Sequence, residues 1–502
     1  MNRIRSIFMG TPSPPAHVHH EYTPLHDPET PVFEGPHRMT NTSTILGGIL
    51  DDDEADELEL GPAHEAPFSW VEYLIFGLVG VAMLWAWNMF LASAPYFALR
   101  LADSPGIRTV SQSAIISVST ITNLIAMAVL MNIQASASYP YRINVALLTN
   151  IGVFALLTLS TFVWTDSASP ESYFAFLLVA VAATAWATGL IQNGAFAFAA
   201  SFGRPEYVQA IMTGQGLAGV LPPITQMVSV VLVPPPASAS KGEDGGTPSS
   251  DAGTTAFIYF LAAVLVSLAA LICFQPLVAR HNRLVEARIG DAMAESFHSV
   301  EDAERASRKV VGVLTLWHKL HWLSAAVFGC FAVAMFFPVF TARIVSVSTR
   351  AAANAVTGAA AGAGGTSGSG LLADPAFFIP LGFFFWNLGD FVGRISSSFP
   401  FLSLRHRPPL LLLAAFLRLG FLPLYVLCNV DGKGAVVESD WFYLLLVQLP
   451  YGLTNGWLAS SCMMASGEWV DENESEAAGA FMGFALVAGL TAGSLASFSV
   501  AG

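Results

Sequence analysis

Charged residues are scarce in this chain of 502 residues. Asp, Glu, Lys and Arg together make up 12% of it, whereas hydrophobic residues make up 54%. In soluble globular proteins about a quarter of the residues are charged. The composition therefore excludes an ordinary soluble protein and indicates a chain that lies largely within a lipid bilayer.

Cysteine is also rare, and its four positions are far apart. Each cysteine lies within or at the end of an apolar stretch: Cys273, Cys330, Cys428 and Cys462. These positions form neither a metal-type cluster nor a disulfide framework of the loops. We therefore predict buried thiols, with no disulfide, no metal site and no cofactor.

Basic clusters and the common catalytic motifs are missing as well. The net charge is -14, and much of the acid lies in two short runs, 51–59 and 471–476. No basic face suggests that nucleic acid binds. We find no phosphate-binding loop, no His/Glu zinc spacing and no nucleophile elbow. The sequence thus predicts neither a nucleic-acid-binding protein nor an enzyme.

The chain does contain repeated apolar runs. A run of about 20 apolar residues is long enough to cross the hydrocarbon core of a bilayer as a helix. We predict eleven such spans: 69–97, 111–134, 144–164, 173–202, 207–233, 254–274, 321–348, 376–399, 409–428, 441–464 and 476–501. The fold class is therefore an all-α integral membrane protein that crosses the bilayer many times.

Polar segments divide the chain into four regions. Residues 1–66 are rich in Pro, His, Thr and acid, which predicts a disordered tail. The polar connection 279–320 separates a six-span bundle (67–278) from a five-span bundle (321–502). A long loop that divides six spans from five resembles the two-bundle, major-facilitator-like arrangement, in which substrate lies between the two bundles near the midplane. The basic residues of the connection place it, and the N-terminus, in the cytosol.

The most informative feature is a polar triplet inside the apolar stretch 377–399. Asn387, Asp390 and Arg394 are spaced by three and four residues. This spacing places them on one helix face within roughly 60°. Since a charge at mid-bilayer costs about 3 kcal/mol or more, such an acid and base face a polar interior. One interpretation is a salt bridge that only joins helices; the other, which the rest of the sequence favours, is a buried ligand site.

Short motifs occur in a fixed order along the spans. They are Trp85-Ala-Trp-Asn-Met-Phe90, Gln192-Asn-Gly194, Gly214-Gln-Gly-Leu-Ala-Gly219, Asn387-x-x-Asp390-x-x-Gly393-Arg394 and Asn455-Gly-Trp-Leu-Ala-Ser460. In this order the chain resembles the equilibrative nucleoside transporter family, and its long tail is similar to that of fungal members. Ala86 stands where the family usually has Pro.

The resemblance implies facilitative transport of nucleosides, and of nucleobases as a possible second class, by alternating access. In the family, the matching positions line the substrate cavity: Leu84, Leu91, Gln192, Asn387, Asp390, Arg394 and Leu490. The family's contacts from the second span would fall near Leu124 and Met127.

The chemistry of these side chains suits a nucleoside. Asp390 can accept bonds from two ribose hydroxyls, and Arg394 can donate from its fork. Gln192 can both donate to and accept from a base, and Trp87 offers a flat packing wall. A structural role stays open for two of them, since Trp87 can serve packing alone and the Asn387 amide can join helices.

The sequence leaves two other kinds of carrier open. A proton-coupled nucleoside symporter would need Asp390 or another buried acid to titrate. A major-facilitator sugar or drug carrier usually has Gly-x-x-x-Asp-Arg after its second span, and residues 135–142 contain neither Gly nor an acid. We expect a multi-pass protein of a vacuolar, lysosome-like or plasma membrane. Its expected partners are the nucleoside and the lipid bilayer, and a monomer is sufficient for the mechanism.

Overall fold

The regular structure of the chain is helical. The computed structural model describes residues 68–133, 138–163, 169–232, 248–290, 311–348, 370–471 and 474–501. Within these ranges an isolated β-bridge joins Ile344 to Val430, and all other regular elements are helices. The predicted all-α class is confirmed. The predicted tail, 1–66, lies outside the described residues.

The first part of the chain contributes seven helices to the described residues. They are α2 (Trp70–Ala92), α3 (Ala94–Arg100), α4 (Pro105–Asn132), α5 (Tyr139–Val163), α6 (Pro170–Ala200), α7 (Pro205–Leu232) and α8 (Pro248–Gly290). Four of these helices begin at a proline. At the first position of a helix the N–H that proline lacks would have no partner within the helix, so no hydrogen bond is lost. The helix α8 continues well into the predicted connection 279–320.

The second part begins with α10 (Val313–Ala334). The remaining helices are α11 (Phe336–Thr341), α13 (Gly370–Ala373), α14 (Pro375–Ser396), α15 (Pro408–Leu417), α16 (Phe421–Val426), the π-helix η3 (Phe442–Gln448), α17 (Leu449–Ala465) and α18 (Ser475–Ala501); short 3-10 turns are η1 (Pro400–Leu402), η2 (Arg418–Gly420) and η4 (Ser466–Trp469). Met335 separates α10 from α11, three residues before Pro338.

Nine helices in the described part of the chain are long and apolar enough to span a membrane. Two further predicted spans, 207–233 and 441–464, coincide with α7 and with η3 and α17, which are outside those nine. The multi-pass architecture is thus confirmed, whereas the count of eleven stays a prediction.

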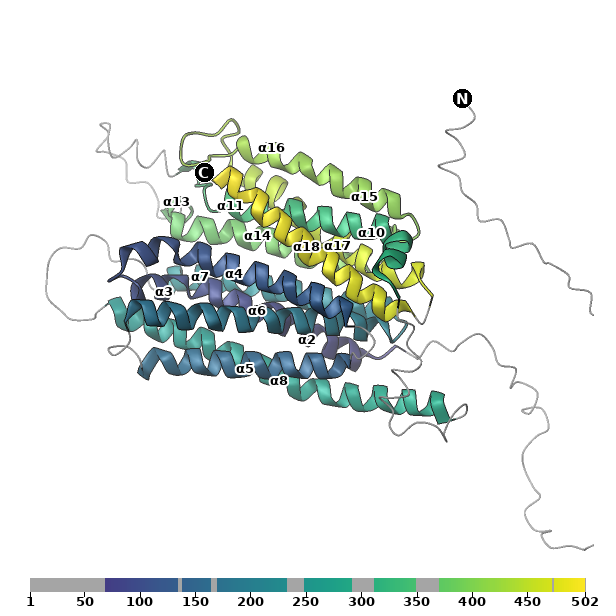
Figure 1. Cartoon of the computed structure of the whole chain (residues 1–502). Coiled ribbons are helices and arrows are strands. Elements are labelled where there is room, and N and C mark those ends of the chain that lie inside the picture. The colour runs from purple at the N-terminus through teal and green to yellow at the C-terminus, as the bar shows by residue number, and fades with distance from the viewer. Residues whose placement is uncertain are drawn as a thin grey trace, which may run out of the picture. The chain divides into compact units, whose positions relative to one another are not determined.

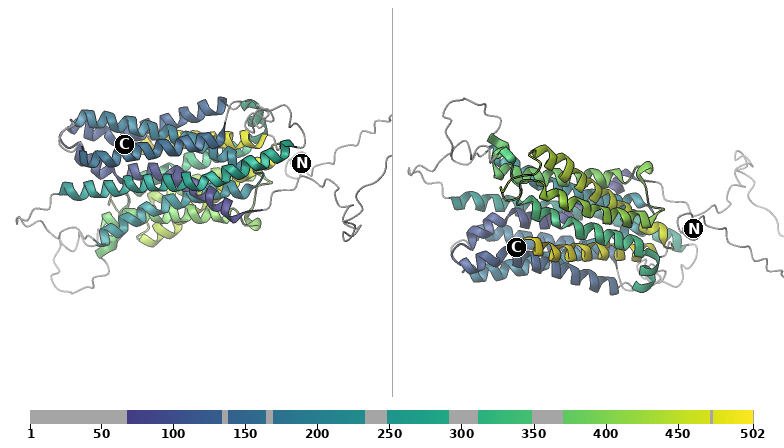
Figure 2. Two further views of the ribbon diagram at one scale, coloured as in Figure 1. Left: turned by 90° about the horizontal axis from the view of Figure 1, so that it is seen from below. Right: turned by 90° about the horizontal axis from the view of Figure 1, so that it is seen from above.

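The N-terminal helices pack mainly on one another. The helix α2 lies against α7 and α8, and α5 lies against α6 and α8. In the C-terminal part α10 packs on α15 and α18, and α14 packs on α17. The two sets meet where α7 lies beside α14 and where α6 lies beside α18 (Figures 1 and 2). The division into a 67–278 bundle and a 321–502 bundle stays a prediction.

Glycines allow α14 and α17 to touch backbone to backbone. A Cβ added to Gly456 would lie 1.9 Å from the carbonyl oxygen of Asp390, and one added to Gly389 would lie 2.2 Å from that of Leu449. No larger residue fits at such distances. Small residues at membrane helix contacts commonly permit this approach. The close crossing fixes the position of Asp390 relative to α17.

Candidate functional site

A cavity of about 320 Å³ lies between the two sets of helices. Its walls come from α2, α4, α6 and α7 on the N-terminal side and from α10, α11, α14, α17 and α18 on the C-terminal side. Small-molecule sites usually occupy about 300–1,000 Å³ and combine an apolar lining with a few polar groups. This cavity fits that description.

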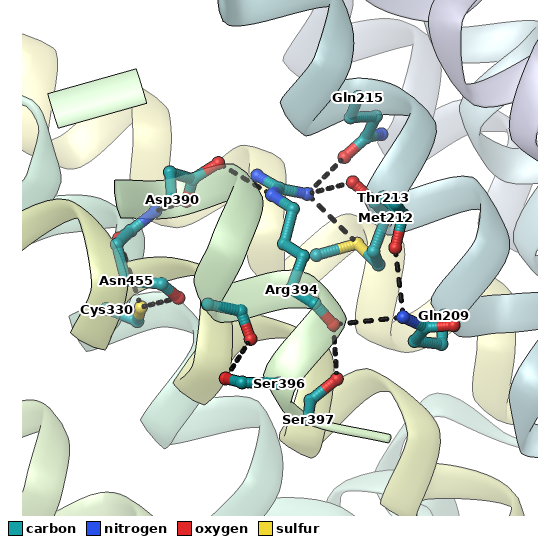
Figure 3. A network of polar contacts seen from close by, with 11 residues as sticks. Gln209, Met212, Thr213, Gln215, Cys330, Asp390, Arg394, Ser396, Ser397 and Asn455 are labelled. Carbon is teal, nitrogen blue, oxygen red and sulfur yellow. Dashed lines mark hydrogen bonds and ion pairs between the residues drawn. The ribbon is translucent and has the colours of Figure 1, made fainter. Parts of the chain in front are cut away.

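The predicted acid–base pair faces the cavity. Asp390 and Arg394 both line it, and each residue is 4% exposed. The Arg394 Nε donates to Asp390 Oδ2 at 2.6 Å, one turn of α14 away. Its Nη1 also donates across to α7, to the Met212 carbonyl at 2.8 Å and to Gln215 Oε1 at 3.2 Å (Figure 3). The pair therefore opens onto the cavity and also joins the N-terminal to the C-terminal helices.

The side-chain amide of Asn455 binds the other carboxylate oxygen of Asp390. Asn455 on α17 donates from Nδ2 to Asp390 Oδ1 at 2.7 Å, and Asn455 Oδ1 accepts from the Cys330 thiol at 3.3 Å (Figure 3). Arg418 donates from Nη1 to the Cys330 carbonyl at 2.6 Å. Each carboxylate oxygen has two acceptor sites, so Asp390 can still accept from a ligand. Arg394 Nη2 donates to no group among the described residues.

Glycines of α7 make room for the polar side chains of α14. A Cβ on Gly219 would lie 2.5 Å from Asn387 Oδ1, and one on Gly216 would lie 2.9 Å from Arg394 Cδ. The amide of Asn387 donates to the Phe383 carbonyl at 2.8 Å, within its own helix. Asn387 and Arg394 therefore pack directly against the glycine-rich motif at 214–219.

Aromatic rings form part of the cavity wall. Trp87 on α2 and Trp386 on α14 both line it. The Trp386 ring stacks on Phe337 with centroids 3.8 Å apart and planes 2° apart. Asn88, next to Trp87, donates from Nδ2 to the Ala218 carbonyl at 2.7 Å and so fixes α2 to α7. These rings give the cavity flat apolar faces.

Two adjacent amides on α6 point in different directions. Asn193 is fully buried, and its Oδ1 accepts from Arg142 on α5. Gln192 lines the cavity, and its side chain makes no hydrogen bond to any described residue. The amide of Gln192 is therefore the one available to a ligand.

The structure brings most of the predicted site residues together. Seven line the cavity: Leu84, Trp87, Gln192, Asn387, Asp390, Arg394 and Leu490. Leu91 does not, and it is 42% exposed. Its neighbour Phe90 lines the cavity, so Leu91 lies at a similar depth, but its side chain is on the exposed surface of α2. Whether the seven bind substrate stays a prediction.

The predicted contacts on α4 are displaced. Met127 is fully buried, and its Cε lies close to Gly483, while Leu124 packs on the same apolar cluster. The α4 residues on the cavity come earlier: Ile116, Ser119, Thr120 and Asn123. No motif anchors this helix in the sequence, so the face could not be placed.

Sequence reasoning also missed Gln215 and Asn455. Both touch the ion pair, and both line the cavity. Each stands directly beside a glycine within a quoted motif, Gly214-Gln-Gly and Asn455-Gly. A polar residue directly beside a glycine inside a span was the feature of the sequence that could have indicated both residues.

The comparisons with known proteins agree with the resemblance that the sequence motifs indicate. The family model described as nucleoside transporter matches residues 176–501, more than half of the chain. The chain is 27% identical to nucleoside transporter FUN26 of Saccharomyces cerevisiae over 471 residues, covering 85% of this chain and 83% of that protein. It is 25% identical to human equilibrative nucleoside transporter 2, covering 84% and 95%.

The fold is also similar to that of a solved transporter. A major facilitator superfamily proton:xylose symporter, XylE, superposes with a TM-score of 0.51 at 11% identity, covering 85% of this chain and 86% of that one. At this identity the likeness concerns the fold alone. It agrees with the major-facilitator-like architecture expected from the sequence.

Proposed function

The chain belongs to the nucleoside transporter family, and we propose on that basis that it carries nucleosides across a membrane through the cavity described above. The carrier works by alternating access and without covalent chemistry. The solute gradient alone drives it. Nucleobases are a possible second substrate class.

The observation that carries the proposal is the Asp390–Arg394 pair on the cavity wall. A ribose has neighbouring hydroxyls that can donate to the carboxylate and accept from the guanidinium. Charge-assisted bonds of this kind are about twice as strong as neutral ones. Asn455 and Gln215 hold the two charged groups in place before the ribose arrives.

The base is expected to contact the other predicted residues. Gln192 offers an amide that can donate and accept, and Trp87 offers a flat face for packing. Leu84 and Leu490 complete the apolar lining, and Asn387 lies one turn from Asp390. Leu91 is left out of this assignment because it does not reach the cavity.

Uptake into proteoliposomes tests the proposal directly. We expect the purified protein to transport radiolabelled uridine and adenosine until the inside and outside concentrations are equal. An imposed proton gradient should not raise the final level. Accumulation that follows the proton gradient would support the symporter instead. Transport of a hexose without transport of any nucleoside would support a sugar carrier.

Replacing Gln192 by Ala should change base preference. The ratio of adenosine to uridine uptake is expected to shift by about fivefold, the effect of one neutral hydrogen bond, because the amide contacts only the base. The preference for ribosides over 2′-deoxyribosides should stay as in the wild type. Gln275→Ala is a matched control, since Gln275 on α8 donates to Asn144 and to the Leu271 carbonyl, away from the cavity. Equal losses for every nucleoside would contradict a base-reading role.

Location and oligomeric state belong to the proposal as well. We place the N-terminus in the cytosol and the protein, as a monomer, in a vacuolar, lysosome-like or plasma membrane. A fluorescent fusion at the N-terminus distinguishes these membranes. Antibody access to the same tag after permeabilising only the plasma membrane tests its side.

A further inference from the structure

A second guanidinium group is buried in the C-terminal helices. Arg418 begins the 3-10 turn η2 and is 2% exposed. It forms no ion pair with any described residue, and within that part of the chain its Nε and Nη2 make no hydrogen bond. Burial of a charge without a counter-ion is costly. The few contacts that Arg418 does make therefore indicate its role.

Arg418 is the first donor in a chain of hydrogen bonds that ends at Asp390. Its Nη1 donates to the Cys330 Sγ atom at 3.0 Å. The Cys330 thiol donates to Asn455 Oδ1 at 3.3 Å, and Asn455 Nδ2 donates to Asp390 Oδ1 at 2.7 Å (Figure 3). Cys330 and Asn455 thus each accept from one neighbour and donate to the next. In a protein interior, bonds arranged in this way polarise and strengthen one another.

The Cys330 thiol determines which way round the Asn455 amide lies. The oxygen of an amide only accepts and its nitrogen only donates. Since Arg418 donates to the sulfur, the hydrogen of the thiol is left for Asn455 Oδ1, and Nδ2 is the atom that faces Asp390. The reversed amide would place its oxygen against the carboxylate and its nitrogen against the thiol hydrogen. Both contacts would then be repulsive.

One face of α17 holds this arrangement together. Tyr451 and Asn455 are four residues apart on α17 and so lie on the same face. The Arg418 guanidinium lies over the Tyr451 ring, with Cζ 5.0 Å from the ring centroid, a contact that attracts a cation. The Tyr451 hydroxyl donates to the Val333 carbonyl of α10. Arg418 and α10 are thus fixed against the part of α17 that presents Asn455 to Asp390.

We propose that Cys330 and Arg418 are positioning residues for recognition of the ribose. This inference rests on the proposed function. Neither side chain lines the cavity, so both act through Asn455, which holds one oxygen of the Asp390 carboxylate. When the chain of hydrogen bonds is broken, the Asn455 amide can turn over and the carboxylate is no longer held in place. Recognition of the ribose hydroxyls then weakens, while the contacts with the base stay as they were.

The test compares uridine with 2′,3′-dideoxyuridine, which lacks both ribose hydroxyls. In proteoliposomes, Cys330→Ala is expected to lower kcat/KM for uridine by about fivefold, the effect of one neutral hydrogen bond, and to change that for the dideoxy compound little. Cys330→Ser should restore most of the loss, because a hydroxyl donates and accepts as the thiol does. Cys462→Ala is the matched control, since the Cys462 thiol is equally buried and hydrogen-bonds to no described residue.

A variant of larger volume separates the lost hydrogen bond from a packing defect. Val is larger than Cys and Ala is smaller, and neither can donate from its side chain. Cys330→Val should therefore lower the preference for uridine as Cys330→Ala does. An effect common to both variants comes from the missing S–H, and either variant is sufficient if the other fails to fold.

A double variant tests whether the two residues act in one chain. Arg418→Met removes the guanidinium but keeps a long unbranched side chain, and it should also lower the preference for uridine by about fivefold. Combined with Cys330→Ala, it should cause no further loss, because both changes act through the same bond to Asn455. Losses that multiply to roughly 25-fold would show separate roles and would contradict a common chain.

The remaining outcomes distinguish this inference from the proposed function. Equal losses for uridine and 2′,3′-dideoxyuridine would show that Cys330 and Arg418 serve folding alone, and they overturn the inference. An unchanged preference in folded variants of a transporting protein overturns it too, and leaves the proposed function intact. Failure of the wild type to transport any nucleoside overturns the proposed function, and this inference with it.

Discussion

Asp390→Asn is expected to reduce nucleoside uptake by about 100-fold while the protein remains folded. The change removes the charge that holds Arg394 at 2.6 Å and that strengthens any bond to a ribose hydroxyl. Hydrogen bonds to charged groups contribute about 1.5–3 kcal/mol, which covers a loss of this size. The amide has nearly the shape of the carboxyl group, so packing against α17 is kept. Initial uptake rates in proteoliposomes measure the effect.

Asp374→Asn is the control for that experiment. Asp374 caps the same helix, accepting from the Ala376 N–H at 2.9 Å, and it does not line the cavity. Asn is as good an N-cap as Asp. This variant should transport like the wild type. Normal uptake by a monodisperse Asp390→Asn protein would show that the ion pair is not the ligand site.

Gly456→Ala is expected to damage both stability and transport. The new Cβ would lie 1.9 Å from the Asp390 carbonyl oxygen, so α14 and α17 must separate. Overpacking of this kind typically costs about 1–3 kcal/mol. The separation would also pull Asn455 away from Asp390, which it holds at 2.7 Å. We expect a lower thermal unfolding midpoint in detergent and a large loss of uptake.

Gly420→Ala provides the comparison within the C-terminal helices. A Cβ at Gly420 meets no atom within 4 Å, so this variant should keep the wild-type midpoint and rate. If Gly456→Ala unfolded at the same temperature as Gly420→Ala, the backbone contact between α14 and α17 would not exist as described.

The fold class was readable because it depends on local properties. Apolar length alone predicts membrane helices, and the bounds of α2, α6, α14 and α18 follow the predicted spans closely. Spacing within one helix also placed Asn387, Asp390 and Arg394 on one face. Residue 91 shows the limit of this reasoning, since the period of one helix does not say which part of its surface the neighbouring helices cover.

The rest of the site depends on contacts between segments distant in the sequence. Gln215 and Asn455 meet the ion pair only because α7 and α17 pack on α14. Asn123 and Thr184 are ordinary polar residues of a span in the sequence, and only the absence of hydrogen-bond partners among the described residues distinguishes them. Neither kind of information is carried by the pattern of one helix.

Arg394 binds its own helix through Asp390 and the opposite helix α7 through Met212 and Gln215. In a carrier whose two sets of helices move relative to one another, the guanidinium thus links the moving parts through hydrogen bonds. A bound nucleoside can offer oxygen atoms that accept from Arg394 when its hydrogen bonds to α7 break. An empty carrier must break those bonds without such a replacement. We therefore expect the return of the empty carrier to be the slow step of the cycle, and the exchange of one nucleoside for another across the membrane to be faster than net uptake.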